Sequence, residues 1–132
     1  AKGIPGWGRT GGAAERTAVD GIGGGNRVVV RRNYIEGFFN GVAGYSPLRE
    51  WNRDRKRGYD IYDNVFTHIV DDVIEPDQGA INWKVWDNRI EESSIAVSVG
   101  PLTYGPLYIF RNTIWQLTDE GVGADVDGIK LG

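Results

Sequence analysis

The chain contains no cysteine, and this absence narrows the chemistry that is open to it. Without thiols it has no disulfide bond, no thiolate metal ligand and no cysteine nucleophile. Methionine is also absent, including at position 1, so we expect a processed product or an excerpt of a longer protein and favour the excerpt. No apolar run approaches the roughly 18 residues of a membrane span, and no segment has the pattern of a signal peptide.

The charge balance is slightly acidic, with 15 basic and 18 acidic residues and a formal net charge of −3. A nucleic-acid-binding surface requires a basic face, so the composition gives no reason to propose nucleic acid as a partner. The 20 glycines, together with many Val, Ile, Tyr and Trp residues, favour strands joined by tight corners over helices. The 132 residues suffice for one domain with one continuous core.

One motif centred on an asparagine occurs four times along the chain. Its copies are residues 28–35, 59–66, 83–90 and 107–114, and their asparagines are Asn33, Asn64, Asn88 and Asn112. Each copy has apolar residues five and three places before the asparagine and another two places after it. A fixed period in the twenties, with two-residue alternation inside each unit, is typical of a β-solenoid. We therefore predict an all-β solenoid of about four to five coils.

Stacking of these coils predicts three inward apolar columns and one ladder of asparagines. The predicted columns are Val28, Tyr59, Trp83 and Leu107; Val30, Ile61, Val85 and Ile109; and Ile35, Phe66, Ile90 and Ile114. Buried amides need hydrogen-bond partners, so we expect each ladder asparagine to bond to the next one and to corner backbone groups. The position just before each asparagine is expected to carry corner charge pairs.

The domain organisation follows from the same repeat. Residues 1–26 are glycine-rich and predict an irregular first coil or an arm, and residues 27–132 form the coils. A loop insertion is expected at 45–58, and its basic run around Arg55 is either a solvated loop or a clamp for an acidic ligand. The end at 128–132 has the pattern of a further strand, so we expect further coils or another chain to cover this end of the solenoid.

An acidic cluster follows the second copy of the motif, at Asp71, Asp72, Glu75 and Asp77. Neighbouring carboxylates can divide acid and base roles, and the pair of an inverting glycosidase lies roughly 6.5–9.5 Å apart. Glu92, one coil further on, is a candidate second carboxylate for Asp72. Two other interpretations stay open, a Ca²⁺ site and a polar turn that caps a strand.

Two further features bear on this cluster. Simple alternation would place Asp71, Val73 and Glu75 on one side of a strand, so a bulge or corner must intervene. The single histidine, His68, lies three residues before Asp71 and is expected in a turn, as a general base or as an ordinary surface residue. A lone histidine does not make a zinc site with the usual ligand sets.

An outward aromatic column falls two places before three of the asparagines, at Tyr62, Trp86 and Phe110. Such a column is either a platform on which sugars stack, with Trp86 at its centre, or a stripe that packs under a loop or a partner.

The repeated unit resembles that of the right-handed parallel β-helix proteins of the pectin-lyase-like superfamily, over about residues 27–132. The resemblance implies a right-handed parallel β-helix. That superfamily includes polysaccharide lyases, polygalacturonase-type hydrolases, epimerases and non-catalytic adhesins and tail proteins. The fold alone therefore does not select a function.

Three segments carry a closer resemblance. Residues 71–79 are similar to the Asp-Asp-Cys-aliphatic-x-x-x-Ser-Gly stretch of polygalacturonase-type hydrolases, which implies catalytic roles for Asp71 and Asp72. Residues 94–100 resemble the Gly-His-Gly-x-Ser-x-Gly stretch of the same proteins, with Ile95 in place of the histidine. Residues 128–130 resemble their Gly-Ile-Arg, which implies that Lys130 meets a substrate carboxylate. Val42 stands where these proteins have another aspartate.

We therefore expect a carbohydrate-active protein that binds or acts on a polysaccharide or oligosaccharide, as a divergent glycoside hydrolase or polysaccharide lyase. The alternative is a non-catalytic glycan-binding, adhesive or assembly module. In the first case Asp71 and Asp72 are the acid and base. The expected substrate contacts are Lys130, Glu75, Asp77, His68, Trp86 and Arg55. No cofactor is expected apart from the Ca²⁺ alternative at residues 71–77, and the expected location is extracellular or periplasmic.

Overall fold

The computed structural model describes residues 17–20, 26–43, 56–76, 79–100, 102, 104–118 and 126–131. These residues form β1 (Thr17–Asp20), β2 (Val29–Arg31), β3 (Tyr34–Glu36), β4 (Asn40–Ala43), β5 (Asp60–Tyr62), β6 (Val65–Thr67), β7 (Asp72–Glu75), β8 (Trp83–Trp86), β9 (Arg89–Glu91), β10 (Ile95–Ser98), β11 (Leu107–Phe110), β12 (Thr113–Trp115) and β13 (Asp127–Lys130). None of the described segments is a helix, and so none provides a helix that could cross a membrane.

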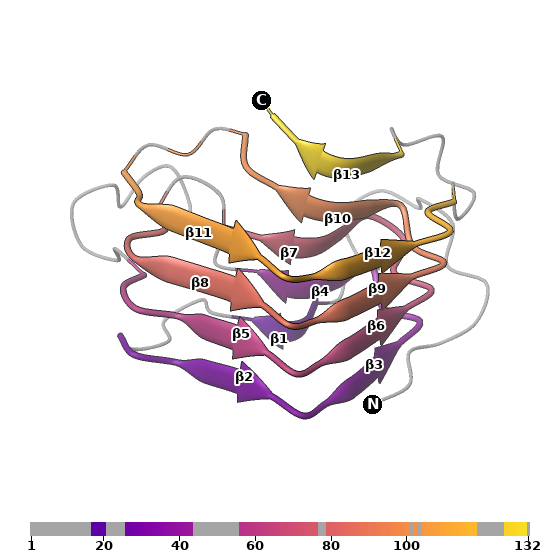
Figure 1. Cartoon of the computed structure of the whole chain (residues 1–132), viewed down its shortest axis with the longest axis horizontal. Coiled ribbons are helices and arrows are strands. Elements are labelled where there is room, and N and C mark those ends of the chain that lie inside the picture. Colours follow the sequence, from indigo (N-terminus) through magenta and orange to yellow (C-terminus); the bar gives the residue numbers. More distant parts are fainter. Residues whose placement is uncertain are drawn as a thin grey trace.

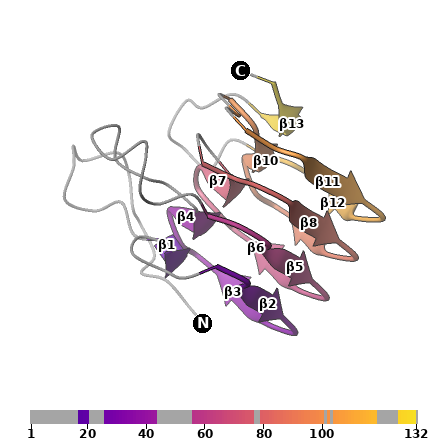
Figure 2. The ribbon, with the colours of Figure 1, turned by 90° about the vertical axis from the view of Figure 1, so that its left-hand side faces the viewer.

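The strands form three parallel sheets that run along one axis. Their orders are β1-β4-β7-β10-β13, β11-β8-β5-β2 and β12-β9-β6-β3. Each coil contributes one strand to each sheet, and Figures 1 and 2 show the coils stacked from β2 at one end to β11 at the other. The predicted all-β parallel solenoid of about four coils is therefore confirmed.

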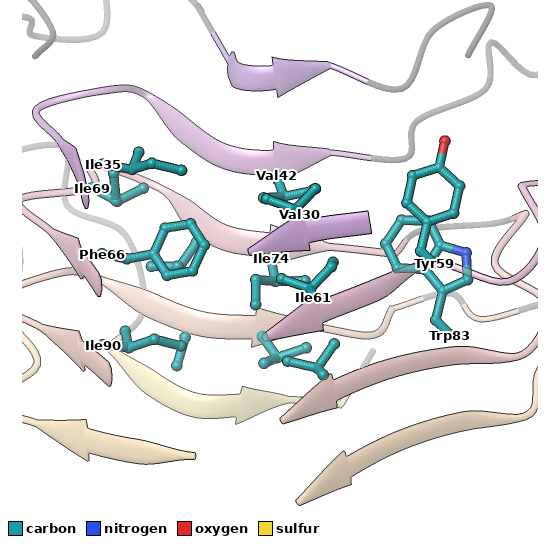
Figure 3. Close-up of a cluster of buried hydrophobic side chains, with 14 of the residues drawn as sticks. Val30, Ile35, Val42, Tyr59, Ile61, Phe66, Ile69, Ile74, Trp83 and Ile90 are labelled. Carbon is teal, nitrogen blue, oxygen red and sulfur yellow. The ribbon is translucent and has the colours of Figure 1, made fainter. Parts of the chain in front are cut away.

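The register of the strands confirms the predicted apolar columns. Ile61 pairs with Val30 on one side and Val85 on the other, and Phe66 pairs with Ile35 and Ile90 in the same way. Figure 3 shows Val30, Ile61, Ile35, Phe66 and Ile90 gathered between the sheets. Ile61 and Phe66 are fully buried. Stacked coils bury this surface jointly, at roughly 1.5–3 kcal/mol for each large apolar side chain.

The asparagine ladder is also present. The Nδ2 group of Asn33 donates to Oδ1 of Asn64 at 3.0 Å, and the next two steps, to Asn88 and Asn112, are both 2.9 Å long. A second Nδ2 bond reaches a main-chain oxygen of the preceding coil, such as that from Asn88 to Ile61 at 2.9 Å. The ladder thus satisfies the buried amides at the corner between two sheets.

The backbone turns sharply at two corners of every coil by adopting a positive φ. Before the ladder asparagines these residues are Arg32, Asp63, Asp87 and Arg111, at 55°, 54°, 52° and 55°. At the corner that follows β3, β6, β9 and β12 they are Gly37, His68, Glu92 and Gln116, at 71°, 53°, 47° and 47°. His68 therefore lies in a turn, as predicted.

The five-stranded sheet departs from simple alternation. Val73 and Ile74 are consecutive residues of β7, and both belong to the core. Ala96 and Val97 of β10 are likewise consecutive core residues, and Ala18 and Val19 of β1 pack against that core. Two inward residues in succession leave the first and last residue of each strand on the outside. This is the irregularity that the sequence pattern required at the acidic cluster.

Two predicted segments lie largely outside the described residues. Of residues 1–26, the structure describes β1, which pairs with β4, and Asn26. Of the insertion at 45–58 it describes the last three residues. Lys56 is 2% exposed there, unlike the solvated or ligand-clamping side chain that the basic run predicted. Its carbonyl oxygen accepts bonds from Trp83 Nε1 and from the Ile81 amide, both 2.9 Å, and these bonds draw the segment against the core.

The fourth coil is less well covered than the two coils below it. Its inward residues are only partly buried, namely Leu107, Ile109 and Ile114. Their neighbours one coil back are fully buried, namely Trp83, Val85 and Ile90. The expectation that further coils or another chain cover this end stays a prediction.

Candidate functional site

Two columns of mostly polar residues run along the five-stranded sheet, one at each end of its strands. Because the middle pair of each strand faces the core, the first and last residues lie toward the outer side of the sheet, where Ala43, Ile95 and Ser98 are nevertheless buried. The first column is Thr17, Asn40, Asp72, Ile95 and Asp127, and the second is Asp20, Ala43, Glu75, Ser98 and Lys130. The sequence-predicted residues Asp72, Glu75 and Lys130 thus lie on one face of one sheet.

Asn40 ties the two acidic residues of β7 to the preceding strand. Its Oδ1 accepts from the main-chain N–H of Asp72 at 3.3 Å, and its Nδ2 donates to Oε2 of Glu75 at 2.8 Å. The Glu75 carboxylate is therefore held in one orientation. Asp72 is 8% exposed, and Glu75 is half-buried.

Lys130 lies two strands away from Glu75 in the second column. Ser98 pairs with Lys130, and the pairing of Val97 with Ile74 sets Ser98 beside Glu75 as well. Two strand spacings amount to roughly 9.6 Å, so the ammonium and the carboxylate are within reach of one bound molecule. The column thus holds an acceptor and a cation that are partly exposed, with the buried Ser98 hydroxyl between them.

Asp71 and His68 occupy the corner that precedes β7, before the first outward position. The main-chain N–H of Asp71 donates to Phe39 and its carbonyl accepts from Ile95, which fixes the backbone there. The His68 ring lies 2.9 Å from Thr67 Oγ1 through Nδ1 and 3.5 Å from Glu92 Oε2 through Nε2. His68 and Glu92 are therefore paired with each other at the corner.

The second carboxylate of the site differs from the one that the sequence suggested. Glu92 sits beside His68, and the strand position in register with Asp72 one coil on is Ile95. One strand further, Ile95 pairs with Asp127, so that Asp127 occupies the same outward column as Asp72. The signal that could have found it is the three-residue spacing shared by Asp72 and Glu75 and by Asp127 and Lys130.

Two predicted contacts, Asp77 and Arg55, lie outside the described residues. Within the described ranges, no three His, Asp or Glu side chains gather closely enough to hold a metal ion. Asp71, Asp72 and Glu75, the described members of the proposed calcium cluster, thus do not form such a group by themselves.

Trp86 belongs to a different face, the outer side of the β11-β8-β5-β2 sheet. Its ring stacks on Tyr62 with centroids 4.4 Å apart and planes 10° apart. It also lies parallel to Phe110, at 6.0 Å and 2°. Sugar rings stack on exposed aromatic faces, but here the neighbouring rings cover the faces of Trp86. The column therefore presents mainly ring edges to solvent, and Trp86 does not lie beside Asp72.

Comparisons of the chain with protein-family models, with curated proteins and with solved structures gave no match. What the fold defines is a parallel β-solenoid with a polar outer sheet face, and this face is the basis for a functional proposal.

Proposed function

We propose that the protein binds a polysaccharide along the outer face of the five-stranded sheet, as a β-helix protein of the pectin-lyase-like kind. The observation that carries the proposal is that Asp72, Glu75 and Lys130 lie in the two end columns of one parallel sheet, with Glu75 and Lys130 partly exposed. Asn40 adds a partly exposed amide to these columns, and Ser98 adds a hydroxyl that is buried.

These groups match the chemistry of a sugar chain. Carboxylates and amide oxygens accept hydrogen bonds from sugar hydroxyls, and Lys130 donates to ring oxygens or to negatively charged substituents. Asn40 orients Glu75 before any ligand arrives, which lowers the entropy lost on binding. Because strands repeat at about 4.8 Å along the axis, the two columns present their groups to successive units of an extended chain. Such a ligand fits an extracellular or periplasmic protein.

Hydrolysis of the bound chain is a second candidate, and one observation favours it. Asp72 and Asp127 share a column with Ile95 between them, so their backbones lie roughly 9.6 Å apart. Inverting glycosidases hold two carboxyl groups roughly 6.5–9.5 Å apart, one to protonate the leaving oxygen and one to activate water. Asp72 and Asp127 would take these two roles.

A binding and turnover screen tests both candidates. The chain is presented with a panel of neutral and acidic plant, algal and bacterial polysaccharides, and binding is measured together with release of reducing ends. Glu75→Gln and Lys130→Gln should each weaken binding about tenfold, because each removes a charge-assisted hydrogen bond. Arg89→Gln, on the β12-β9-β6-β3 sheet, is the matched control and should change binding less than about twofold.

The outcomes separate the candidates. If hydrolysis occurs, Asp72→Asn and Asp127→Asn should abolish turnover and leave binding measurable. Binding without turnover supports the non-catalytic module. The proposal fails if the wild-type chain binds nothing in the panel, or if Glu75→Gln and Lys130→Gln bind as well as Arg89→Gln does.

A further inference from the structure

A groove crosses the outer face of the β11-β8-β5-β2 sheet, away from the site described above. It has a volume of about 400 Å³ and is lined by Asp60, Tyr62, Lys84, Trp86, Phe110 and Arg111. The register sets Lys84 beside Asp60 and Trp86 beside Tyr62, so the groove lies between a charged column and the aromatic column.

The aromatic wall attracts electron-rich groups. Since the rings of Tyr62, Trp86 and Phe110 are stacked on one another, their edges face the groove side. The edge of an aromatic ring is the positive part of its quadrupole, which favours oxygen acceptors and anions over the C–H face of a sugar. The wall therefore supports a ligand that carries negative oxygens.

Arg111 is oriented by a bidentate pair with Asp87 at the end of this wall. Its Nε and Nη2 donate to the two carboxylate oxygens of Asp87 at 2.9 and 2.8 Å, and its guanidinium carbon lies 5.5 Å from the ring centroids of both Trp86 and Phe110. A guanidinium has five N–H donors, and the pairing with Asp87 uses two of them. The other donors are oriented in advance for a second acceptor.

Lys84 and Asp60 form a loose pair on the opposite side of the groove. Lys84 Nζ lies 3.5 Å from Asp60 Oδ1, longer than a direct charge-assisted hydrogen bond, and both side chains are partly exposed. A ligand oxygen can therefore replace this contact at little cost. Asp60 then remains as an acceptor that repels a bare anion but accepts a hydroxyl group.

We propose that this groove binds a sugar that carries a sulfate or phosphate ester. Lys84 and Arg111 bind the ester oxygens, and Asp60 accepts a sugar hydroxyl. Lys84 and Arg111 line the groove from neighbouring coils, and donors from two directions suit a tetrahedral group with three acceptor oxygens better than a planar carboxylate with two. The proposal rests on the proposed polysaccharide function, to which it adds a second, charge-selective site on another sheet.

Calorimetry with one sugar backbone in four forms tests this site: dextran oligomers that are unmodified, sulfated, phosphorylated or carboxymethylated. The sulfated or phosphorylated form should bind at least about tenfold more tightly than the other two, and the comparison between these esters identifies the preferred one. Arg111→Gln and Lys84→Gln should each reduce that affinity about tenfold, which corresponds to the loss of one charge-assisted hydrogen bond. The matched control is Arg89→Gln, because Arg89 also binds a carboxylate, that of Glu91 at 2.7 Å, on the neighbouring sheet.

The inference is overturned if Arg111→Gln and Arg89→Gln have equal effects, or if unmodified dextran binds as well as the esters. Inorganic sulfate that binds as tightly as the sulfated oligomer would also overturn it, because Asp60 could then contribute no hydroxyl recognition. If Arg111→Gln disturbs the fold, Lys84→Gln still tests the groove. Lys84 is paired only loosely with Asp60, so its replacement should leave the fold intact. Loss of ester binding in Lys84→Gln but not in Lys130→Gln separates this groove from the site on the five-stranded sheet.

Discussion

Asn64 and Asn88 form one rung of the ladder that joins the coils. Oδ1 of Asn88 accepts two bonds from Asn64, one from Nδ2 at 2.9 Å and one from the main-chain N–H at 3.2 Å. Both residues are at most 2% exposed. A single side-chain oxygen thus satisfies two buried donors of the neighbouring coil.

Replacing Asn88 by leucine should lower the free energy of unfolding by about 2–5 kcal/mol. The substitution leaves the main-chain N–H of Asn64 without its acceptor and removes one of three acceptors of the Asn64 Nδ2 group. An unsatisfied buried group costs roughly 1–3 kcal/mol, and a lost hydrogen bond adds to this. Urea denaturation measures the change. Asn33→Leu is the control: Asn33 is exposed and only donates to the ladder, so its loss should cost less. Equal stability of Asn88→Leu and the wild type would contradict the role of the ladder.

Gly41→Ala should destabilise the fold by about 1–3 kcal/mol, because a Cβ atom at Gly41 would lie 2.4 Å from the carbonyl oxygen of Val73 in the next strand. Backbone cannot move aside as a flexible side chain can. Gly128→Ala occupies the matching position three strands away, where the nearest atom, Ile114 Cδ1, is 4.0 Å distant. We expect Gly128→Ala to be tolerated in thermal unfolding, and similar losses in both variants would show that the close approach is not the cause.

At the second corner, Gln116→Asn should stabilise the protein by up to about 1 kcal/mol, and Gln116→Val should destabilise it by about 1–2 kcal/mol. Gln116 has a φ of 47°, a region that asparagine tolerates and β-branched residues avoid. Chemical denaturation of the two variants provides the comparison. If Gln116→Asn and Gln116→Val are equally stable, the backbone of this corner relaxes when its residue is replaced.

Tyr59 should make the protein sensitive to alkali. Burial raises the pKa of its phenol above the ordinary value of 10.0, and the negative charge of Asp20 raises it further. As the pH rises, the unfolded chain therefore loses the Tyr59 proton before the folded protein does. The stability that the protonated phenol contributes below pH 10 is lost as the pH rises from about 10 towards the pKa of Tyr59 in the folded state. Stability measured between pH 8 and 11 should fall less steeply in Tyr59→Phe, and Asp20→Asn should give an intermediate slope.

The same phenylalanine variant should gain about 1 kcal/mol at neutral pH. The Tyr59 hydroxyl is buried and has no hydrogen-bond partner among the described residues, while the ring stacks on Trp83 at 4.2 Å. Removing the hydroxyl keeps the stack and removes the cost of an unpaired polar group. A loss of stability in Tyr59→Phe would show that the hydroxyl has a favourable contact.

The sequence was sufficient for the scaffold because the repeat determines both periodicity and partners. Positions fixed relative to each asparagine predicted which residues stack, down to the pairs of Ile61 and Phe66. The site was less predictable. The two consecutive inward residues of β7 and β10 are set by the local backbone, and a two-residue alternation rule does not place them. For the same reason the sequence suggested Glu92 where the structure puts Asp127 in the column of Asp72.

The groove was missed for a different reason. Its lining combines three columns, and sequence position gives the column of a residue but not the direction in which its side chain turns. The aromatic column was visible in the sequence, but that its rings cover one another's faces depends on side-chain rotamers. The stacking geometry turns a predicted sugar platform into an edge-on wall beside Lys84 and Arg111.

The spacing of the ladder also bears on how the chain folds. Its partners are 31 residues apart at the first step and 24 at the next two. No rung can form before a loop of that size closes, so folding should be slow, as for other chains dominated by non-local strand pairing. The longer first loop adds only ~0.2 kcal/mol of closure entropy over the shorter ones. Added length between one asparagine and the next should therefore change the folding rate very little. The step that sets this rate is the stacking of the first two coils.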